Sequence, residues 1–449
     1  MTRKVMLFLS IVSFLAMASF VVVLSTHAAD DLAATAVAAN GHTSWVRITV
    51  DSQNDVGQYL SLAAQYGSDV PYIAYYDATA GDLKLAQRTA GNCGPNQTWS
   101  CVVLDGNSST DVGQYVSLAF NGSDYGVVYY DAFFGVNRYT NPASGIWGET
   151  VEFVAGFEVG QVNDLVYDDG VPHVAYYRDV PNGRFGYARR VGSGGNCAAW
   201  QCTVIAPVGG SFAIDAALYS GLGIAYSSTA SGLGYAVPVN GGGNCGDGQW
   251  ACTTINANAL PTATSLQMAH CGLLGCSSPA QIAYYDYLQG ILMYAVRVEN
   301  GQGNCPGNAN WTCSLIEFLS TPLNPVAPGL SLLVVNDQPV IIYQDLDDQT
   351  NSILKAAWPE ADGNCGPHQD WRCVVVDSGA RVGGFVDVGQ ALDAKVINGR
   401  IHIAYDDADN GDLLLAYEPA AVPPPPTPSP APTPDPTATY YLFLPSVMR

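Results

Sequence analysis

The chain has 449 residues and a strong excess of acid, with 39 Asp and Glu residues, 17 Lys and Arg residues and a formal net charge of −22. Binding to phosphate backbones depends on neutralising phosphates with cations, so this balance excludes nucleic acid and anionic membrane surfaces as expected partners. The acidity instead favours a soluble secreted protein, or one that attracts calcium or a cationic ligand.

The chain begins with a basic head at Arg3 and Lys4, followed by an apolar run over residues 5–24 and by small residues before Asp30. This order predicts a secretory signal peptide at residues 1–29 and a spacer at 30–41. The apolar run is long enough to span a bilayer, so an uncleaved anchor is the alternative. Either reading predicts that the rest of the chain is secreted or held at the cell surface.

Residues 42–419 carry two repeated markers. The first is a Trp followed by a β-rich run that often ends in Asp, and its copies begin at Trp45, Trp99, Trp147, Trp200, Trp250, Trp311 and Trp371. The second is Ile-Ala-Tyr-Tyr-Asp, and its copies begin at Ile73, Val127, Val174, Ile224, Ile282, Ile341 and Ile403. After the last copy come one more strand and then prolines, so residues 45–51 must supply the strand that this unit lacks.

That arrangement describes a closed ring. One unit, residues 52–105, contains four short segments rich in β-branched and aromatic residues, separated by turn-forming residues. We therefore predict an all-β, seven-bladed β-propeller with four-stranded antiparallel blades, whose N-terminal strand closes the last blade and removes the open sheet edges. The blades are expected at residues 52–105, 106–154, 155–206, 207–257, 258–317, 318–377, and 378–418 together with 42–51.

Twelve cysteines form six close pairs, which predicts disulfide bonds in an exported protein. Zinc is the alternative, but the pairs are not Cys-x-x-Cys and leave no evident four-ligand set. The predicted bonds are Cys93–Cys101, Cys197–Cys202, Cys245–Cys252, Cys271–Cys276, Cys305–Cys313 and Cys365–Cys373. In most pairs the first Cys follows Gly-Asn and the second follows Trp-x, so the bond closes the hairpin between the third and fourth strands.

In position, this hairpin resembles the Asp-box repeats of sialidase-type propellers, which also place a Trp just after the turn. The resemblance is architectural, covers residues 42–418, and implies a secreted bacterial propeller related to that class. The Asp-box wording, Ser-x-Asp-x-Gly-x-Thr-Trp, is absent and is replaced by the disulfide hairpins. Sialidase activity would need a cluster of arginines, and the arginines here are few and scattered, which argues against it.

The loops between the second and third strands, and those between blades, open on one face of a propeller, the top face, which is the expected site. Carboxylates and aromatic rings fall in these loops. The candidate ligand contacts are Asp77, Asp131, Asp286, Asp345, Asp407, Tyr287 and Phe134, with Tyr115, Phe133 and Phe385 as further aromatic residues. The alternative for the carboxylates is turn capping, because Asp77-Ala-Thr-Ala-Gly81 has the form of an Asx turn that ends in Gly.

Calcium is the one metal that this pattern favours, because hard oxygen ligands suit it. The densest acidic clusters, at residues 345–348 and 407–412, propose Asp345, Asp347, Asp407 and Asp409 as ligands. Neither cluster matches an EF-hand loop. His173 and His402 fall at the opposite face and are expected to be structural.

Residues 420–439 form a Pro-rich linker, which is expected to be an extended stalk. Residues 440–449 form an apolar tail, too short to span a membrane as a helix. Linker and tail together resemble the Pro/Thr-rich spacer and short apolar-basic terminus on surface proteins of some filamentous bacteria, which implies a sorting or anchoring signal.

The leading functional hypothesis is recognition of a carbohydrate or an extracellular protein through the acidic, aromatic top face. The alternatives are a glycoside hydrolase or lyase that uses paired rim carboxylates, and a purely structural surface protein. A multivalent lectin should repeat its pocket in every blade, whereas an enzyme should concentrate unusual residues in one or two. We expect a monomer that meets a membrane only through its N-terminal segment or C-terminal tail.

Overall fold

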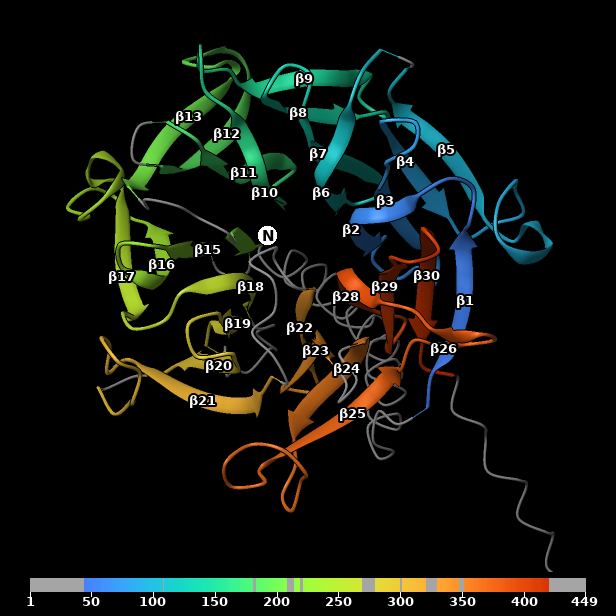
Figure 1. The fold of residues 1–449 in the computed structure, drawn as a ribbon. Helices are drawn as coiled ribbons and strands as arrows, with labels where there is room; N and C mark the ends of the chain where they lie inside the picture. Colours follow the sequence, from blue (N-terminus) through green and yellow to red (C-terminus); the bar gives the residue numbers. More distant parts are fainter. Residues whose placement is uncertain are drawn as a thin grey trace, which may run out of the picture. The chain divides into compact units, whose positions relative to one another are not determined.

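The computed structural model describes residues 44–419, except for 108, 181–182, 208–213, 219–220, 269–278, 299–300, 320–328 and 347–350. The predicted signal peptide, spacer, linker and tail lie outside these residues, as do Asp347 and the pair Cys271 and Cys276. Within the described ranges, seven four-stranded antiparallel sheets follow one another around a ring, as predicted (Figure 1). No helix in this part of the chain is long and apolar enough to cross a membrane.

Blades 1 to 6 each use four consecutive strands, from the channel outward. These are β2 (Val56–Ala64), β3 (Pro71–Asp77), β4 (Asp82–Gln87) and β5 (Ser100–Asp105) in blade 1; β6 (Val112–Asn121), β7 (Asp124–Asp131), β8 (Val136–Asn141) and β9 (Ile146–Glu152) in blade 2; β10 (Val159–Asp168), β11 (Val171–Arg178), β12 (Arg184–Gly195) and β13 (Ala198–Pro207) in blade 3; β14 (Ile214–Leu218), β15 (Leu222–Ser228), β16 (Gly232–Pro238) and β17 (Trp250–Asn256) in blade 4; β18 (Pro261–Gln267), β19 (Gln281–Asp286), β20 (Ile291–Arg297) and β21 (Trp311–Phe318) in blade 5; and β22 (Leu330–Val335), β23 (Gln338–Leu346), β24 (Ser352–Pro359) and β25 (Trp371–Asp377) in blade 6.

Blade 7 joins the two ends of the ring. Its strands are β28 (Val388–Ile397), β29 (Arg400–Asp407) and β30 (Asp412–Tyr417), and its outer strand is β1 (Val46–Asp51). Strand β1 runs antiparallel to β30, with Val46 opposite Tyr417 and Asp51 opposite Leu413 (Figure 1). The predicted closure by the N-terminal strand is therefore confirmed. A small extra hairpin, β26 (Ala380–Arg381) and β27 (Gly384–Phe385), precedes blade 7.

Each of the three residues of the Gly-Asn-Cys motif has a structural role in the hairpin. A Cβ on Gly91 would lie 2.3 Å from the carbonyl oxygen of Trp99, so only glycine permits this close approach. The Asn92 side chain donates to the carbonyl oxygen of Cys101 and accepts its N–H, at 3.0 and 2.8 Å. The disulfide then closes the hairpin. Five of the six predicted disulfides are present: Cys93–Cys101, Cys197–Cys202, Cys245–Cys252, Cys305–Cys313 and Cys365–Cys373.

The Trp marker needs one correction, in blade 2. The tryptophans that follow the disulfide hairpins are buried, as Trp99 is at 0% exposed, but Trp147 is 58% exposed. In the other units the last residue of the marker comes six positions after the Trp, as Asp105 follows Trp99. In blade 2 that residue is Glu152, so Trp147 lies one position out of step. A shift of one residue turns a side chain to the other face of a strand, which accounts for its exposure.

The innermost strands are tied together by a ring of hydrogen bonds that the sequence analysis missed. At one equivalent position in every blade a Ser or Asp side chain accepts a backbone N–H from the next blade. The pairs are Ser61 with Leu118 (3.1 Å), Ser117 with Leu165 (3.0 Å), Asp164 with Ala216 (2.7 Å), Asp215 with Leu266 (2.6 Å), Ser265 with Leu332 (2.9 Å), Ser331 with Ala394 (3.1 Å) and Asp393 with Leu62 (2.9 Å). These bonds satisfy buried donors and fix the spacing of the blades.

Candidate functional site

The predicted rim carboxylates are buried, and their contacts are internal. Asp77, Asp131, Asp286, Asp345 and Asp407 are each 3% exposed or less. Asp77 shows a pattern that Asp131 and Asp407 share: its Oδ1 accepts the N–H of Ala80 at 3.0 Å and its carbonyl oxygen accepts the N–H of Gly81 at 2.8 Å. Gly81 has a φ of 71°, which agrees with the alternative that Asp77 caps an Asx turn ending in glycine. A ligand role for these five carboxylates stays a prediction.

The first Tyr of the second marker, which is present in all seven copies, connects six of the seven blades to the blade before. Tyr75 donates its hydroxyl to Asp51 at 2.7 Å, and Tyr405 donates to Asp377 at 2.9 Å. Each acceptor ends the outer strand of the preceding blade, so the two sequence markers meet in space. Tyr129, Tyr176 and Tyr343 donate in the same way to Asp105, Glu152 and Glu317, whereas Tyr284 accepts a hydrogen bond from the side-chain amide of Asn256 at 3.0 Å. We call each such pair an interblade clasp; it satisfies the hydroxyl of a buried tyrosine.

A positively charged side chain lies beside most of these clasps, and the element that supplies it differs from blade to blade. Lys84 and Arg138 extend from third strands, where they pair across the strands with the constant Tyr of their own blades. Blade 3 has Gly186 at that place and uses Arg178 instead, which contacts Glu152 at 2.9 Å. Blade 7 takes Arg381 from the extra hairpin, at 3.0 Å from Asp377. Arg178 stands where other copies of the second marker end in Asp, and its positive charge balances the buried Glu152 of the preceding blade.

The electrostatics of the blade 7 clasp show the effect of these partners. Burial by itself would raise the pKa of Asp377, but hydrogen bonds from Arg381 and Tyr405 outweigh it and hold the pKa below its usual value. Arg47 adds a further contact at 2.6 Å. The clasp therefore keeps a buried carboxylate charged and paired.

The two predicted aromatic contacts lie on separate blades. Phe134 is 58% exposed in the turn after β7, packs edge-on against Phe133 at 4.9 Å, and lies under the guanidinium of Arg138 at 5.2 Å. Tyr287 is half-buried in the turn after β19. Because β7 belongs to blade 2 and β19 to blade 5, the two rings stand in turns of different blades. A ligand role for either ring stays a prediction.

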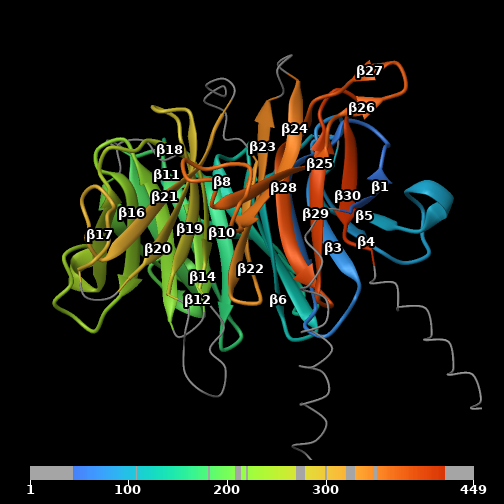
Figure 2. The ribbon, with the colours of Figure 1, turned by 90° about the horizontal axis from the view of Figure 1, so that it is seen from below.

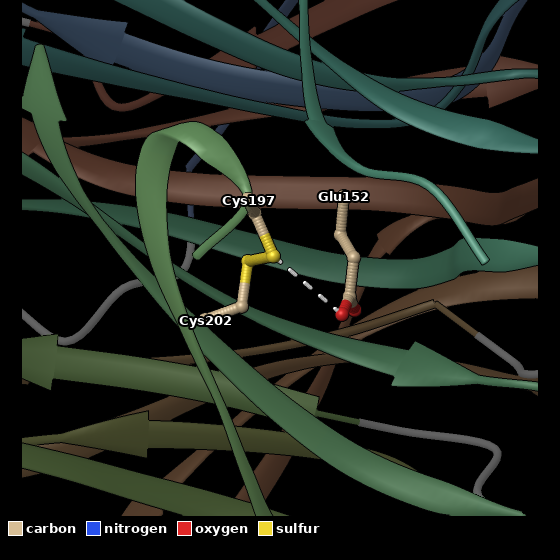
Figure 3. Close-up of side chains that lie close together, drawn as sticks. All are labelled: Glu152, Cys197 and Cys202. Atoms are coloured by element: carbon tan, nitrogen blue, oxygen red, sulfur yellow. Dashed lines mark hydrogen bonds between the residues drawn. A yellow bond between two sulfur atoms is a disulfide. The ribbon is translucent and has the colours of Figure 1, made fainter. Parts of the chain in front are cut away.

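Three of the four predicted calcium ligands, Asp345, Asp407 and Asp409, lie in the described ranges, and each has a partner within the protein. Asp345 pairs with Lys355 at 3.1 Å, Asp407 holds the side chain of Asn410, and Asp409 accepts the N–H of Asp387. The one cluster of three ligand-type side chains in the described ranges is Glu152 with Cys197 and Cys202 (Figure 3). Its two sulfurs are bonded to each other, so they offer no thiolate to a metal. Calcium binding stays a prediction.

A cavity of about 480 Å³ lies beneath the extra hairpin, on the top face of blade 7. Figure 2 shows β26 and β27 at one face of the ring. Arg381 anchors the hairpin through Asp377 and Asp407, at 3.0 and 3.5 Å. The residues of the hairpin that line the cavity include Phe385, which is 51% exposed. The facing wall contains Thr49, Asp407, Asn410, Asp412 and Leu414.

The two carboxylates of this cavity have different environments. Asp407 is 2% exposed and is held by Asn410 and Arg381. Burial raises the pKa of Asp412, and the negative charges of Asp407 and Asp51 raise it further. The cavity therefore combines a fixed carboxylate, a second carboxylate whose pKa is raised, an amide and an aromatic ring. Sequence analysis singled out Asp407 and Phe385 separately, but nothing local in the sequence placed them in one cavity.

The central channel contains a larger cavity of about 1010 Å³, lined by the innermost strands. Its charged groups are Asp164, Asp215, Asp393 and Lys395. Burial and the neighbouring Asp164 raise the pKa of Asp215. The three carboxylates accept the N–H groups of the next blades, and Lys395 pairs with Asp393 at 3.1 Å. These charges thus have structural partners, which makes the channel a weaker candidate than the blade 7 cavity.

No family model matches this sequence, and no curated protein matches it either. Solved structures give distant likenesses. AofleA from Arthrobotrys oligospora has 10% identity and a TM-score of 0.39, covering 76% of this chain and 94% of its own. A mutant of the Aleuria aurantia lectin in complex with α-methyl-L-fucoside has 14% identity and a TM-score of 0.41, with coverages of 75% and 99%. Trypanosoma rangeli sialidase in complex with sialic acid has 10% identity and a TM-score of 0.40, with coverages of 84% and 59%. The likeness concerns the arrangement of the chain alone.

Proposed function

We propose that the protein is an extracellular carbohydrate-binding propeller, and that it binds sugar in the cavity beneath the extra hairpin of blade 7. The observation that carries this proposal is the composition of that cavity, where the exposed ring of Phe385 shares the lining with Asp412 and Asn410. Aromatic rings stack on the apolar faces of sugars, while carboxylates and amides accept and donate hydrogen bonds to their hydroxyl groups. A cavity of this size suits a small saccharide.

The hairpin gives the site its asymmetry. Among the described residues, a hairpin of this kind occurs only before blade 7, so the ring does not repeat this cavity around its axis. The protein would therefore bind through one principal site. The five disulfides support function outside the cytosol, where such bonds persist.

The test is a glycan-array screen of the full chain, followed by affinity measurements on the strongest glycan. Phe385→Ala should weaken binding at least tenfold, because the stacking ring is lost. Phe318→Ala is the matched control, since that ring is 71% exposed at the end of β21 in blade 5 and should leave binding unchanged. Equal affinity of wild type and Phe385→Ala would overturn the site, and the absence of any glycan hit would favour a protein ligand.

Glycoside hydrolysis is the second candidate, because the same cavity holds two carboxylates with different environments. Blade 1 has the same cross-strand acidic pair, Asp77 opposite Asp82, without a hairpin above it, which weighs against a special role for the pair. Incubation of each array hit with the protein decides the matter. Cleavage that is lost in Asp412→Asn while binding is retained would establish an enzyme.

A further inference from the structure

Two lysines are buried between blades, each between two carboxylates. The Nζ of Lys84 lies 2.7 Å from Oδ2 of Asp51 and 3.6 Å from Oδ2 of Asp77. The Nζ of Lys355 contacts Oε2 of Glu317 and lies 3.1 Å from Oδ2 of Asp345. In both cases the first carboxylate lies in the last two residues of the outer strand of the preceding blade, and the second lies in the last two residues of the second strand of the same blade.

The two sites share the same surroundings. The side chains of Lys84 and Asp51 are 11% and 1% exposed, and the Tyr75 ring lies 5.4 Å from the amine. The Tyr75 hydroxyl donates to the same Oδ2 of Asp51 that Lys84 contacts, and burial together with that carboxylate raises the pKa of Tyr75, which keeps it a donor. Tyr343 stands in the same relation to Lys355 and Glu317.

We propose that Lys84 and Asp51 are joined by an amide bond, and that Lys355 and Glu317 are joined in the same way. The Lys84 ammonium gives a proton to Asp77, and the freed amine attacks the carboxyl carbon of Asp51. Asp77 then returns the proton to the departing oxygen, a second amine proton leaves with it, and one water molecule is released. An ammonium and a carboxylate thus become a neutral amide and water, without an oxidant or a reductant. Asp345 plays the part of Asp77 at the second site.

Three features favour the condensation. The reacting groups are held together, which replaces a bimolecular step by an intramolecular one with effective molarities on the order of 10⁵ M or more. The product removes two charges from a site where charges are poorly solvated. The Tyr75 hydroxyl is placed to stabilise the oxygen that becomes negative during attack. At the first site the bond ties β1 to β4, so it closes the ring covalently across blades 7 and 1.

The other clasps provide an internal comparison. Arg138, Arg178 and Arg381 occupy the cation place in blades 2, 3 and 7 and contact acids at 2.9, 2.9 and 3.0 Å. A guanidinium serves an ion pair equally well but is a poor nucleophile, because it remains protonated. Amide bonds are therefore expected at the two lysine clasps and not at the three arginine clasps.

The experiment is tryptic mapping of the full chain after reduction and alkylation. Trypsin cuts after Arg47 and Arg88, but not after an amide-linked Lys84, so residues 48–88 should emerge as one peptide that is lighter by one water molecule. Residues 298–372 should emerge likewise, uncut at Lys355. Lys84→Arg should restore the full mass of the first region and leave the second unchanged, and Asp77→Asn should restore normal cleavage after Lys84.

The outcomes separate the parts of the proposal. Complete cleavage after Lys84 and Lys355 in the wild type, with both regions at full mass, would overturn it. A bond that survives in Asp77→Asn would overturn the proton-carrying role of Asp77. Because both regions are read from the same folded, secreted sample, the second region controls for the folding of each first-region variant.

Discussion

Asp393 in blade 7 accepts the backbone N–H of Leu62 in blade 1 at 2.9 Å, and this contact completes the ring of seven hydrogen bonds around the channel. It joins the first blade to the last on the channel side, while β1 and β30 join the two ends of the chain on the outer side. The propeller is therefore closed twice, once by side chains and once by a strand.

Asp393→Ala should destabilise the fold by about 1–3 kcal/mol, because it leaves the buried N–H of Leu62 without an acceptor. Chemical denaturation of the full chain measures the loss. Asp69→Ala is the control, since Asp69 is exposed and makes no hydrogen bond to a described residue. Equal stabilities of the two variants would show that the hydrogen bond between Asp393 and Leu62 does not stabilise the fold.

The interblade clasps predict a contrast between two tyrosines. Tyr405 donates to Asp377, whereas Tyr226 has Ala206 at the place where other blades provide the acid or Asn. Both rings are buried, at 0% and 5% exposed. Tyr405→Phe should therefore cost about 1.5–3 kcal/mol of unfolding free energy, and Tyr226→Phe clearly less. If the two variants lose the same unfolding free energy, the hydrogen bond from Tyr405 to Asp377 does not stabilise the fold.

Sequence reasoning recovered the ring, its closure and the disulfide hairpins because each has a local signal that repeats. Alternation of apolar and turn residues marks strands, and the spacing of Cys93 and Cys101 marks a hairpin. It also found both halves of the clasp, the constant Tyr and the final Asp of the Trp marker, without joining them. Their contact links different blades, and no local pattern encodes which partner a strand meets across an interface.

The candidate site was recovered less completely, for a related reason. The carboxylate of Asp407 and the ring of Phe385 were each identified, but their shared cavity depends on the fold of the hairpin between them. Val382 and Gly383 form its tip, and Arg381 fixes its position through two ion pairs. The Ser and Asp residues of the channel ring were missed because a single polar residue in an apolar strand has no distinctive period.

Two tryptophans that share a sequence marker should differ sharply in their contribution to stability. Trp99 is 0% exposed beneath the hairpin of blade 1, whereas Trp147 is 58% exposed on β9. Trp99→Ala should cost about 3–5 kcal/mol by leaving a cavity, and Trp147→Ala should stay within about 0.5 kcal/mol. Thermal unfolding followed by circular dichroism compares them directly. A large loss for Trp147→Ala would mean that this ring packs against the blade in solution.

His402 predicts a specific dependence of stability on pH. It is 1% exposed in β29, stacks on Tyr417 at 5.6 Å, and its Nδ1 donates to the carbonyl oxygen of Arg400 at 3.1 Å. Burial lowers the pKa of His402 to about 4, although the hydrogen bond to the Arg400 carbonyl raises it. The positive charges of Arg400 and Arg88 lower the pKa further, and the negative charge of Glu418 raises it. In the unfolded chain the pKa is about 6.5. Between these values the unfolded chain binds a proton that the folded chain refuses, so acidification through this window destabilises the fold.

Relative to His402→Gln, the wild type should therefore lose about 2–3 kcal/mol of unfolding free energy as pH falls from 7.5 to 4, with no further difference below that. Urea denaturation at intervals across the range measures it. Burial also raises the pKa of Asp406, four residues further along β29, to about 7. This acts in the opposite direction, because protonation of Asp406 stabilises the fold at low pH. Asp406 is present in both proteins, so its effect cancels in the difference between them. Identical pH profiles would mean that His402 takes up a proton in the folded state as easily as in the unfolded chain, and that water reaches the first residues of β29.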